Sequence, residues 1–362
     1  MKQIVMLEAM HWNEKSWARV MSHAGRVSLV QLEGYSWTGH TEVWQEGRCV
    51  HCTPPKREPI QLGHFDQMTF GSVLAFTTIK RAWPVMKSQH TDLVIANANS
   101  MAMAALFFRT IGRTRKVVCL VGDYFPLQGT LAVRVYRRIC GYLTNWLAQR
   151  ADEAWFISPR IPMNSANPHN FLVPIWIDDA ASTRSPREEI GYVGMPSPDH
   201  ALEMLFEICR KYGYRLNIIG DSPYLQTIKS SAPSGTVFHG LISNQAKIGA
   251  ILSRCFCGYA IYRNTGPQNY SYYGFPSKIL SYLTNNTPVV TTDTAHFMNV
   301  IEKFGIGYVV EPQFEQIEKA ILDLKTRPAE FYEAISRFRA AWNADVEKFH
   351  QERLAVLLED KI

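Results

Sequence analysis

The segment Tyr270–Val290 holds the residues of this chain that are best suited to chemistry. Pro276 and Ser277 open a predicted helix there, and Lys278 lies in its first turn. Proline fits the first turn of a helix, and serine is a preferred N-terminal cap. A helix start offers free backbone N–H groups and a partial positive charge, to which the lysine adds its ammonium. This combination suits a phosphate or diphosphate, although an ordinary capped helix with a solvated lysine fits the same spacing.

Further candidate positions follow predicted strands of the second half. Three of these strands end in glycine, at Gly194, Gly220 and Gly240. Glycine lets a ligand or a helix approach the backbone closely, and ligands of open parallel sheets bind at the carboxyl ends of strands. The chain has neither the GxGxxG fingerprint of dinucleotide sites nor the Walker lysine motif. A phosphate-bearing mononucleotide held between two domains therefore fits better than NAD or ATP.

The elements around these residues alternate between short apolar strands and helices. One series runs from residues 4–7 to 154–157, and a second runs from 189–194 to 305–310. Strands that alternate with helices predict parallel βαβ units, so the fold class is α/β with two Rossmann-like halves. Residues 34–70 are aromatic and contain proline, and we expect them to be irregular.

The length of 362 residues suits two domains better than one core. We expect a first domain at 1–175, a polar linker at 176–189, a second domain at 190–335 and a final helix within 336–362. No apolar run reaches the roughly 18–20 residues that span a bilayer, and the N-terminus lacks the pattern of a signal peptide. These features predict a cytoplasmic protein.

The net charge of +6 comes from the first half of the chain. Residues 1–180 hold 19 Lys and Arg against 13 Asp and Glu, whereas residues 181–362 hold 19 of each kind. The basic residues form two clusters, Arg109, Arg113, Arg115 and Lys116, and then Arg134, Arg137 and Arg138. Such a surface suits an anionic membrane face or an anionic acceptor, and scattered solvated charge is the alternative. Nucleic acid is not an expected partner, because no recognition motif for it is present.

The cysteines do not indicate a disulfide framework or a metal site. Their number, seven, is odd, and several lie in apolar segments, so free thiols in a reducing compartment are expected. Cys49 and Cys52 have CxxC spacing with His64 nearby, but no second ligand pair accompanies them. No DxD-type acid pair stands out either, so no metal or other cofactor is implied.

The order and spacing of several motifs in residues 190–312 resemble the nucleotide-sugar domain of GT-B glycosyltransferases, most closely glycosyltransferase family 4. These motifs are Ile190–Gly194, Leu216–Pro223, Val237–Leu241, Phe275–Val290 and Gly305–Gly307. The first half resembles the acceptor domain of bacterial surface-polysaccharide members of that family. The segments that carry this second resemblance are Thr91–Ala96, Val117–Pro126 and Arg150–Ser158.

The resemblance implies a GT-B architecture, in which two Rossmann-like domains face each other across a cleft and the final helix crosses back to the first domain. It implies a retaining transfer of a sugar from a nucleotide diphosphate sugar to a lipid-linked or oligosaccharide acceptor. The setting would be bacterial O-antigen, capsule or exopolysaccharide assembly, with the protein peripheral at the inner membrane face.

The resemblance also implies roles for particular residues. Lys278, Arg263 and the backbone N–H groups of Ser277 and Gly194 would stabilise the leaving diphosphate. The remaining donor-side candidates are Gly220, Gly240, Tyr272 and Tyr273, of which the tyrosines would line the sugar pocket or pack in the core. The acceptor-side candidates are His11, Asn13 and Asp123, of which Asp123 would orient the sugar or bind the acceptor hydroxyl, or simply cap a turn.

The sequence departs from the family pattern in two places. The family often has Glu-x7-Glu where this chain has Tyr273 and Ser281, and often has His-Asp where this chain has Gly122 and Asp123. The missing glutamates leave two alternatives open. One is a sugar-nucleotide 2-epimerase of the same fold, and the other is a non-catalytic partner that resembles a glycosyltransferase.

Overall fold

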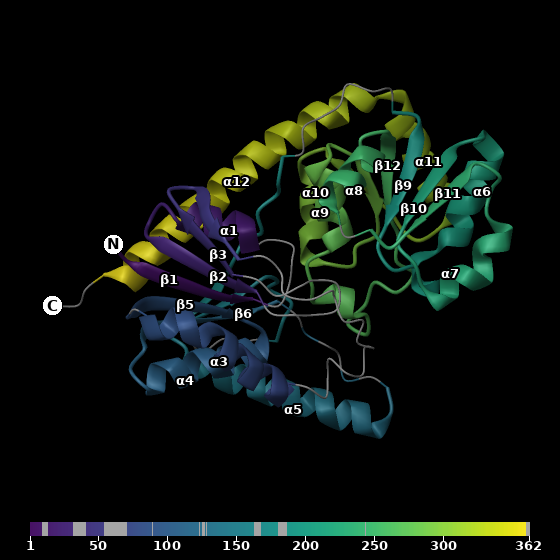
Figure 1. Cartoon of the computed structure of the whole chain (residues 1–362). Helices are drawn as coiled ribbons and strands as arrows, with labels where there is room; N and C mark the ends of the chain where they lie inside the picture. Colours follow the sequence, from purple (N-terminus) through teal and green to yellow (C-terminus); the bar gives the residue numbers. More distant parts are fainter. Residues whose placement is uncertain are drawn as a thin grey trace. The chain divides into compact units, whose positions relative to one another are not determined.

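The computed structural model describes most of the chain (Figure 1). The described residues are 1–8, 14–31, 41–53, 71–88, 90–122, 124, 127, 129–162, 168–179, 187–242 and 244–359. The predicted site residues His11, Asn13 and Asp123 lie outside these ranges. The chain divides into two compact units, of which unit 1 comprises Met1–Trp176 with Ala344–Ile362 and unit 2 comprises Ile177–Asn343.

Unit 1 is built on an eight-stranded sheet in the order β4-β3-β2-β1-β5-β6-β7-β8. Its strands are β1 (Gln3–Glu8), β2 (Arg26–Gln31), β3 (Thr41–Gln45), β4 (Arg48–Cys52), β5 (Thr91–Asn97), β6 (Thr114–Val121), β7 (Glu153–Phe156) and β8 (Asn170–Leu172). Neighbouring strands are parallel, except that β3 is antiparallel to both β2 and β4. The side chains of β1 from Ile4 to Leu7 are buried, as expected for a central parallel strand covered on both faces.

The hairpin β3–β4 corrects one expectation, because residues 41–52 are not irregular. Glu46 and Gly47 form its turn with φ values of 50° and 76°, and two residues at positive φ are typical of a tight hairpin. All five residues of β4 are exposed. An exposed strand has no buried face, so it gives no alternation of apolar and polar residues for a sequence to reveal.

In the described part of unit 1 the helices are α1 (Glu14–Met21), α3 (Gly71–Ser88), α4 (Ala98–Thr110) and α5 (Leu131–Arg150). The last helix of the chain, α12 (Pro328–Leu358), begins in unit 2 and ends in unit 1. Its final part packs on β7, where Phe349 lies edge-on to Trp155 with ring centroids 5.4 Å apart. Among the described helices, none is both long enough and apolar enough to cross a bilayer.

Unit 2 is built on a six-stranded sheet, parallel throughout, in the order β11-β10-β9-β12-β13-β14. Its strands are β9 (Glu189–Val193), β10 (Arg215–Ile219), β11 (Thr236–Gly240), β12 (Cys255–Ala260), β13 (Val289–Thr291) and β14 (Gly307–Val309). Its helices are α6 (Leu202–Tyr212), α7 (Pro223–Ile228), α8 (Gln245–Leu252), α9 (Ser277–Thr284), α10 (Asn299–Lys303), α11 (Phe314–Thr326) and the first part of α12. The expected alternation of strands and helices is thus confirmed.

Helix α9 is fixed to the sheet of unit 2 by Tyr282. The ring of Tyr282 lies over Gly258, where a Cβ atom would come within 2.5 Å of its Cγ. Its hydroxyl donates to the Tyr259 carbonyl at 2.8 Å and accepts the N–H of Val193 at 3.0 Å. One side chain therefore joins α9 to both β9 and β12, and this sets the position of the first turn of the helix.

Each sheet has a point where the direction of strand addition reverses. In unit 2, β10 and β11 add on one side of β9, and β12, β13 and β14 add on the other. The loops that follow β9 and β12 therefore diverge from the carboxyl ends of these two neighbouring strands. Such a place is called a topological switch point, and ligands of open α/β sheets bind there. In unit 1 the reversal lies between β1 and β5, and the chain after β1 continues into residues outside the described part.

Candidate functional site

The switch point of unit 2 brings together the chain after β9, the chain after β12 and the start of α9. The helix begins at Ser277, and its N-cap residue is Pro276. The expectation that serine caps this helix is therefore wrong, because the exposed Ser277 is already the first helical residue. The Pro276 carbonyl accepts the N–H groups of Ile279 and Leu280 at 2.9 and 3.3 Å. Among the described residues, no acceptor is seen for the N–H groups of Ser277 and Lys278.

Lys278 is buried directly beneath this helix start, and its side chain is 8% exposed. Its Nζ lies 2.9 Å from His200 Nε2 and sits over the rings of Tyr192 and Tyr262, at 5.0 and 4.7 Å from their centroids. Burial lowers the pKa of Lys278 to about 7, although the charge of Asp199 acts in the opposite direction. The amine therefore changes charge near neutral pH.

His200 is held by the turn that follows β9. Its Nδ1 accepts the backbone N–H of Ser197 at 3.1 Å, and the Tyr192 hydroxyl lies 2.8 Å from the same nitrogen. Burial, together with the charge of Lys278, lowers the pKa of His200 to about 3, so the imidazole is neutral. Because a backbone N–H can only donate, the ring proton belongs on Nε2, where it meets the lysine amine. A neutral Lys278 can accept that proton, which agrees with the lowered pKa of its ammonium.

Asp199 organises the chain after β12. Its carboxylate accepts the N–H of Asn264 and the side-chain amide of Asn269, both at 2.8 Å, and its carbonyl accepts the N–H of Arg263 at 2.7 Å. The Arg263 guanidinium forms an ion pair with Glu203 on α6, and both side chains are nearly half exposed. The sequence-predicted Arg263 thus lies beside the switch point with its charge engaged by a carboxylate.

The three predicted glycines behave differently from one another. At Gly194, with φ of +119°, a Cβ atom would meet Lys278 Cε at 2.7 Å, so the glycine makes room for the lysine stem. At Gly220, with φ of +136°, a Cβ atom would lie 1.9 Å from the Gly194 carbonyl oxygen. Gly240, with φ of +65°, has open space around it, and its carbonyl accepts the N–H of Gly220 at 2.8 Å. Close approach by the protein's own chain explains the first two.

The predicted tyrosines lie just before α9. Asn269 caps a short helical turn at Tyr270–Tyr272 by accepting the N–H of Ser271 at 2.9 Å. The rings of Tyr272 and Tyr273 meet edge to face with centroids 5.0 Å apart, and both side chains are partly exposed. They therefore lie in the segment between Asn269 and Lys278, next to the start of α9.

Two residues of this site, Asp199 and His200, escaped the sequence analysis. The signal was present, because Ser197, Pro198, Asp199 and His200 follow the predicted strand end at Gly194 within a few residues. A serine followed three residues later by a side chain that reaches back is a capping pattern.

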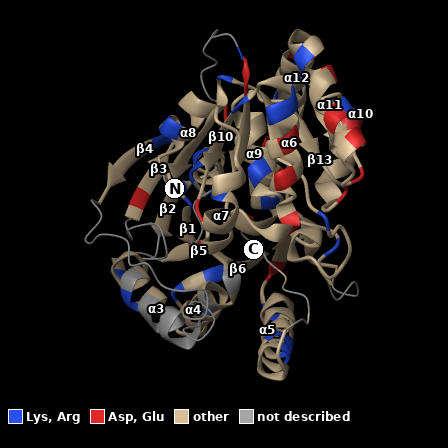
Figure 2. Cartoon of the chain, turned by 90° about the vertical axis from the view of Figure 1, so that its right-hand side faces the viewer, with Lys and Arg blue, Asp and Glu red and all other residues tan. Residues whose placement is uncertain are grey.

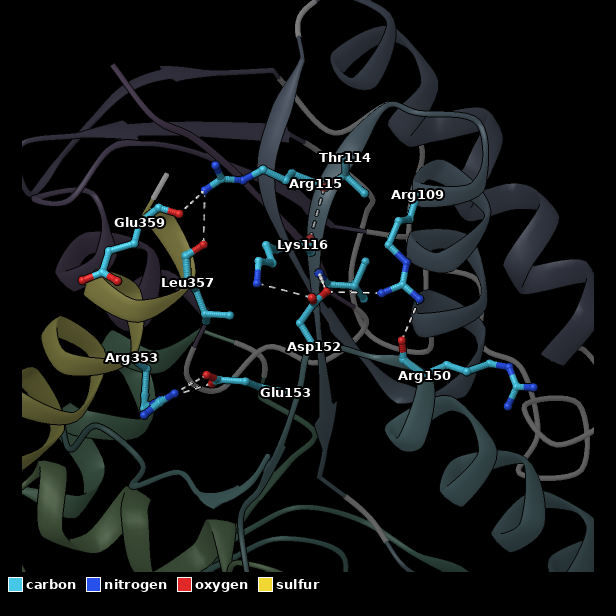
Figure 3. Close-up of polar contacts among 11 residues, drawn as sticks. Arg109, Thr114, Arg115, Lys116, Arg150, Asp152, Glu153, Arg353, Leu357 and Glu359 are labelled. Carbon is cyan, nitrogen blue, oxygen red and sulfur yellow. Dashed lines mark hydrogen bonds and ion pairs between the residues drawn. The ribbon is translucent and has the colours of Figure 1, made fainter. Parts of the chain in front are cut away.

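The first predicted basic cluster proves to be structural (Figure 3). Arg109 pairs with Asp152 at 3.2 Å, and Lys116 approaches the same carboxylate at 3.5 Å. Arg115 donates to the carbonyls of Leu357 and Glu359 at 3.5 and 3.1 Å. These contacts join α4 and β6 to Asp152, which directly precedes β7, and join β6 to the end of α12 within unit 1. Three of the four charges of the cluster thus already have partners.

Among the described residues, no three His, Cys, Asp or Glu side chains gather in a group that could hold a metal ion. The seven cysteines are free thiols, and Cys49 and Cys52 are exposed on β4. Burial raises the pKa of Cys119 and Cys255 to about 12, so those two thiols are inert.

Comparison with known proteins establishes the fold. No protein-family model and no curated protein matches the sequence. Among solved structures, sucrose-phosphate synthase from Thermosynechococcus elongatus is similar with a TM-score of 0.70 and 11% identity, over 98% of this chain and 100% of that one. Anabaena HepE in complex with UDP-glucose is similar with a TM-score of 0.61 and 12% identity, over 98% of this chain and 100% of that one. WaaG, a glycosyltransferase involved in lipopolysaccharide biosynthesis, is similar with a TM-score of 0.60 and 12% identity, over 99% of this chain and 100% of that one.

These similarities, at so low an identity, concern the fold alone. They extend over nearly the whole chain, and they confirm the predicted GT-B fold with its two Rossmann-like units. Membership of glycosyltransferase family 4 stays a prediction.

Proposed function

We propose that this protein is a glycosyltransferase that takes a sugar from a nucleotide diphosphate sugar and passes it to a glycan acceptor. The observation that carries the proposal is the buried amine of Lys278 at the switch point of unit 2. Among the described residues no carboxylate lies within ion-pair distance of it, and a buried lysine without a counter-charge is costly. A diphosphate placed against the start of α9 would supply that counter-charge.

The chemistry asks little of the protein beyond binding and electrostatics. The bond between the anomeric carbon and a diphosphate oxygen breaks, the acceptor hydroxyl oxygen bonds to that carbon, and the hydroxyl proton passes to the departing diphosphate. Negative charge grows on the departing diphosphate, and preorganised donors that face this charge lower the barrier. The N–H groups of Ser277 and Lys278 and the Lys278 amine, which takes up a proton as the anion approaches, are the groups proposed for this role.

The stereochemistry, the acceptor and the biological setting that we propose are those that the sequence resemblance implies. We propose a retaining transfer to a lipid-linked or oligosaccharide acceptor in bacterial surface-polysaccharide assembly, with His11, Asn13 and Asp123 on the acceptor side. The similarity to WaaG, which is involved in lipopolysaccharide biosynthesis, supports this choice of acceptor. A uridine diphosphate sugar is the first donor to test, because HepE was solved with UDP-glucose.

The test is to incubate the protein with a panel of UDP-, GDP- and CMP-sugars, with and without oligosaccharide acceptors, while measuring nucleotide release and sugar products. Nucleotide release that depends on acceptor supports transfer. An altered sugar nucleotide without release would instead show the epimerase of the same fold, and failure to bind any nucleotide would show a non-catalytic partner.

Lys278→Met provides the matched structural test. Loss of one charge-assisted contact should lower the transfer rate at least about tenfold, which corresponds to about 1.4 kcal/mol. The exposed Lys247 on α8 supplies the control, since Lys247→Met should leave the rate unchanged. Equal rates for wild type and Lys278→Met, with the fold intact, would contradict the role of Lys278. The predicted independence from divalent metal is checked by adding a chelator.

A further inference from the structure

Helix α5 of unit 1 presents an apolar stripe to solvent. Its members follow one another at spacings of four, four, three and four residues, so they share one helical face. The exposed fractions are 70% for Leu131, 50% for Val135, 59% for Ile139, 70% for Tyr142 and 46% for Trp146. Only Leu147 and Ala148 of this twenty-residue helix are buried. The helix therefore packs on unit 1 through its other face and leaves a second apolar face uncovered.

The charges beside the stripe have a single sign. Arg134 and Arg138 are exposed on one flank of it, and Arg150 lies near its end, over the ring of Trp146 at 4.0 Å. The helix contains no Asp or Glu, and Figure 2 shows its ribbon in tan and blue only. Among the described residues, no carboxylate forms an ion pair with Arg134 or Arg138. Arg137, which the sequence analysis grouped with them, points toward the packed side of the helix and is half-buried.

We infer that α5 docks unit 1 onto an anionic lipid surface, with the stripe Leu131, Val135, Ile139, Tyr142 and Trp146 in the headgroup region and Arg134 and Arg138 on lipid phosphates. A helix that lies in a membrane interface has an apolar face with aromatic residues and a basic flank. The stripe is about 22 Å long at 1.5 Å per residue, which suits a helix lying parallel to the surface. The arginines select an anionic surface, because each adds attraction to anionic headgroups within a Debye length.

The charge pattern favours lipid over a second copy of the chain. A symmetric contact between two α5 helices would place arginines of the same sign beside each other, with no acidic residue on the helix to offset them. The other basic cluster does not compete for the lipid, since Arg109, Arg115 and Lys116 already have partners inside unit 1.

Flotation of the full chain with vesicles tests the inference. We expect binding to vesicles of phosphatidylcholine with phosphatidylglycerol, little binding to pure phosphatidylcholine, and weaker binding as salt rises. The double variant Ile139→Gln/Tyr142→Gln should lower the partition coefficient at least about tenfold, and Arg134→Gln/Arg138→Gln should lower it by a similar factor. The control Val356→Gln changes an exposed apolar residue of α12 and should have no effect.

Three results would overturn the inference. One is failure of the wild type to bind anionic vesicles, and another is equal loss of binding in the Val356→Gln control. The third is a soluble dimer, seen by light scattering, that Ile139→Gln/Tyr142→Gln dissociates, since that would make a second copy the occupant. Circular dichroism checks the fold of each variant. The inference does not depend on the donor site, because nucleotide binding by the α5 variants should equal that of the wild type.

Discussion

At the scale of single residues, the most telling feature is the contact between Lys278 and His200. A lysine was expected at this helix start, but its partner was not. The sequence predicted a solvated or ligand-bound ammonium, whereas the side chain is buried against a neutral imidazole. Sequence patterns locate a residue on an element, but the depth of its side chain depends on which other loops converge there. In this case Gly194 clears the space that the lysine stem fills.

The buried lysine should make stability depend on pH. Burial lowers the pKa of Lys278 from 10.5 to about 7, so between these values the unfolded chain holds one proton that the folded chain lacks. This contribution to stability is full above the unfolded pKa and is lost as pH falls through the folded pKa, at up to about 1.4 kcal/mol per pH unit. Lys278→Met should therefore be more stable than wild type at pH 6, with a difference that shrinks towards pH 10. Urea unfolding across this range measures it.

The control for this comparison is Lys247→Met, which changes an exposed lysine of the same unit. Its stability relative to wild type should not vary with pH. A constant difference between Lys278→Met and wild type across the range would contradict a lowered lysine pKa.

Gly220 should tolerate no side chain. Alanine there would place Cβ 1.9 Å from the Gly194 carbonyl oxygen, at a φ of +136° that L residues rarely adopt. We expect Gly220→Ala to lower the free energy of unfolding by about 3 kcal/mol or more. Gly213→Ala is the matched control, because Gly213 also has positive φ, +68°, but nothing within 4 Å of a Cβ atom. It should lose about 1 kcal/mol, from backbone strain alone. Urea unfolding measures both losses. Similar losses in the two variants would contradict the idea that the approach of the Gly194 carbonyl oxygen excludes a side chain at position 220.

At the scale of elements, α9 has a different kind of support at each end. Its first turn offers N–H groups to a ligand, while two arginines bind carbonyls at its last turn. Arg339 donates to the Leu283 carbonyl at 3.0 Å, and Arg187 donates to the Asn285 carbonyl at 3.1 Å. Cations at a helix C-terminus also complement the helix dipole. The helix that presents Lys278 is thus fixed from its far end.

Arg339→Met should loosen this support. The change leaves the Asn286 side-chain oxygen, which lies 2.9 Å from the guanidinium, without this donor, and it removes one of the donors to the Leu283 carbonyl. We expect a loss of about 2–3 kcal/mol in unfolding free energy and weaker nucleotide binding, because α9 carries Lys278. The control is Arg337→Met, which changes an exposed arginine of α12, the helix that also carries Arg339. Arg337 forms an ion pair with Glu333, and its replacement should change stability by less than about 0.5 kcal/mol. Calorimetry with UDP tests the effect on binding, and unchanged affinity would separate α9 from the site.

The elements that the sequence predicted correctly are those with one buried face or two. Strand β9 is buried throughout and strand β1 is buried from Ile4 to Leu7, and their apolar runs predicted them. The hairpin β3–β4 was missed because β4 is exposed on every residue. Helix α5 belongs to the predicted alternation of strands and helices, yet the pattern did not reveal that its residues form two apolar faces, only one of which packs within the protein. Periodicity gives the faces of a helix, and tertiary contacts decide which of them is covered.

At the scale of the whole molecule, the alternation of strands and helices predicted two Rossmann-like halves, and the resemblance of the motifs implied the GT-B fold. Similarity to solved structures over nearly the full chain confirms that fold. The two sheets share one arrangement, in which the first strand of each unit lies inside the sheet and later strands add on both sides. The switch points follow from that order. The resemblance implied that the final helix returns to the first unit, but a continuous helical pattern carries no sign of the residue, Ala344, at which α12 enters that unit.

The return of α12 to unit 1 closes a long-range ion pair that should be essential to that unit. Arg353 forms an ion pair with Glu153, which is 3% exposed and also accepts the indole N–H of Trp155 at 2.8 Å. Arg353→Met would leave a buried carboxylate without its cation, and we expect a loss of about 3–5 kcal/mol. The control is Lys348→Met on the exposed side of α12, whose contact with Glu352 spans 4.0 Å and which should change stability little. Thermal unfolding of both variants gives the comparison, and equal melting temperatures would contradict the importance of the pair.

The same ion pair has a consequence for the order in which the molecule is made. Glu153 and Arg353 are separated by 200 positions, and a ribosome that adds about 5–20 residues per second needs about 10–40 s to cover that distance. Throughout that interval β7 has left the ribosome without the guanidinium that its carboxylate requires, whereas all of unit 2 emerges before Arg353 does. The half of the protein that is translated first must therefore be the half that is finished last.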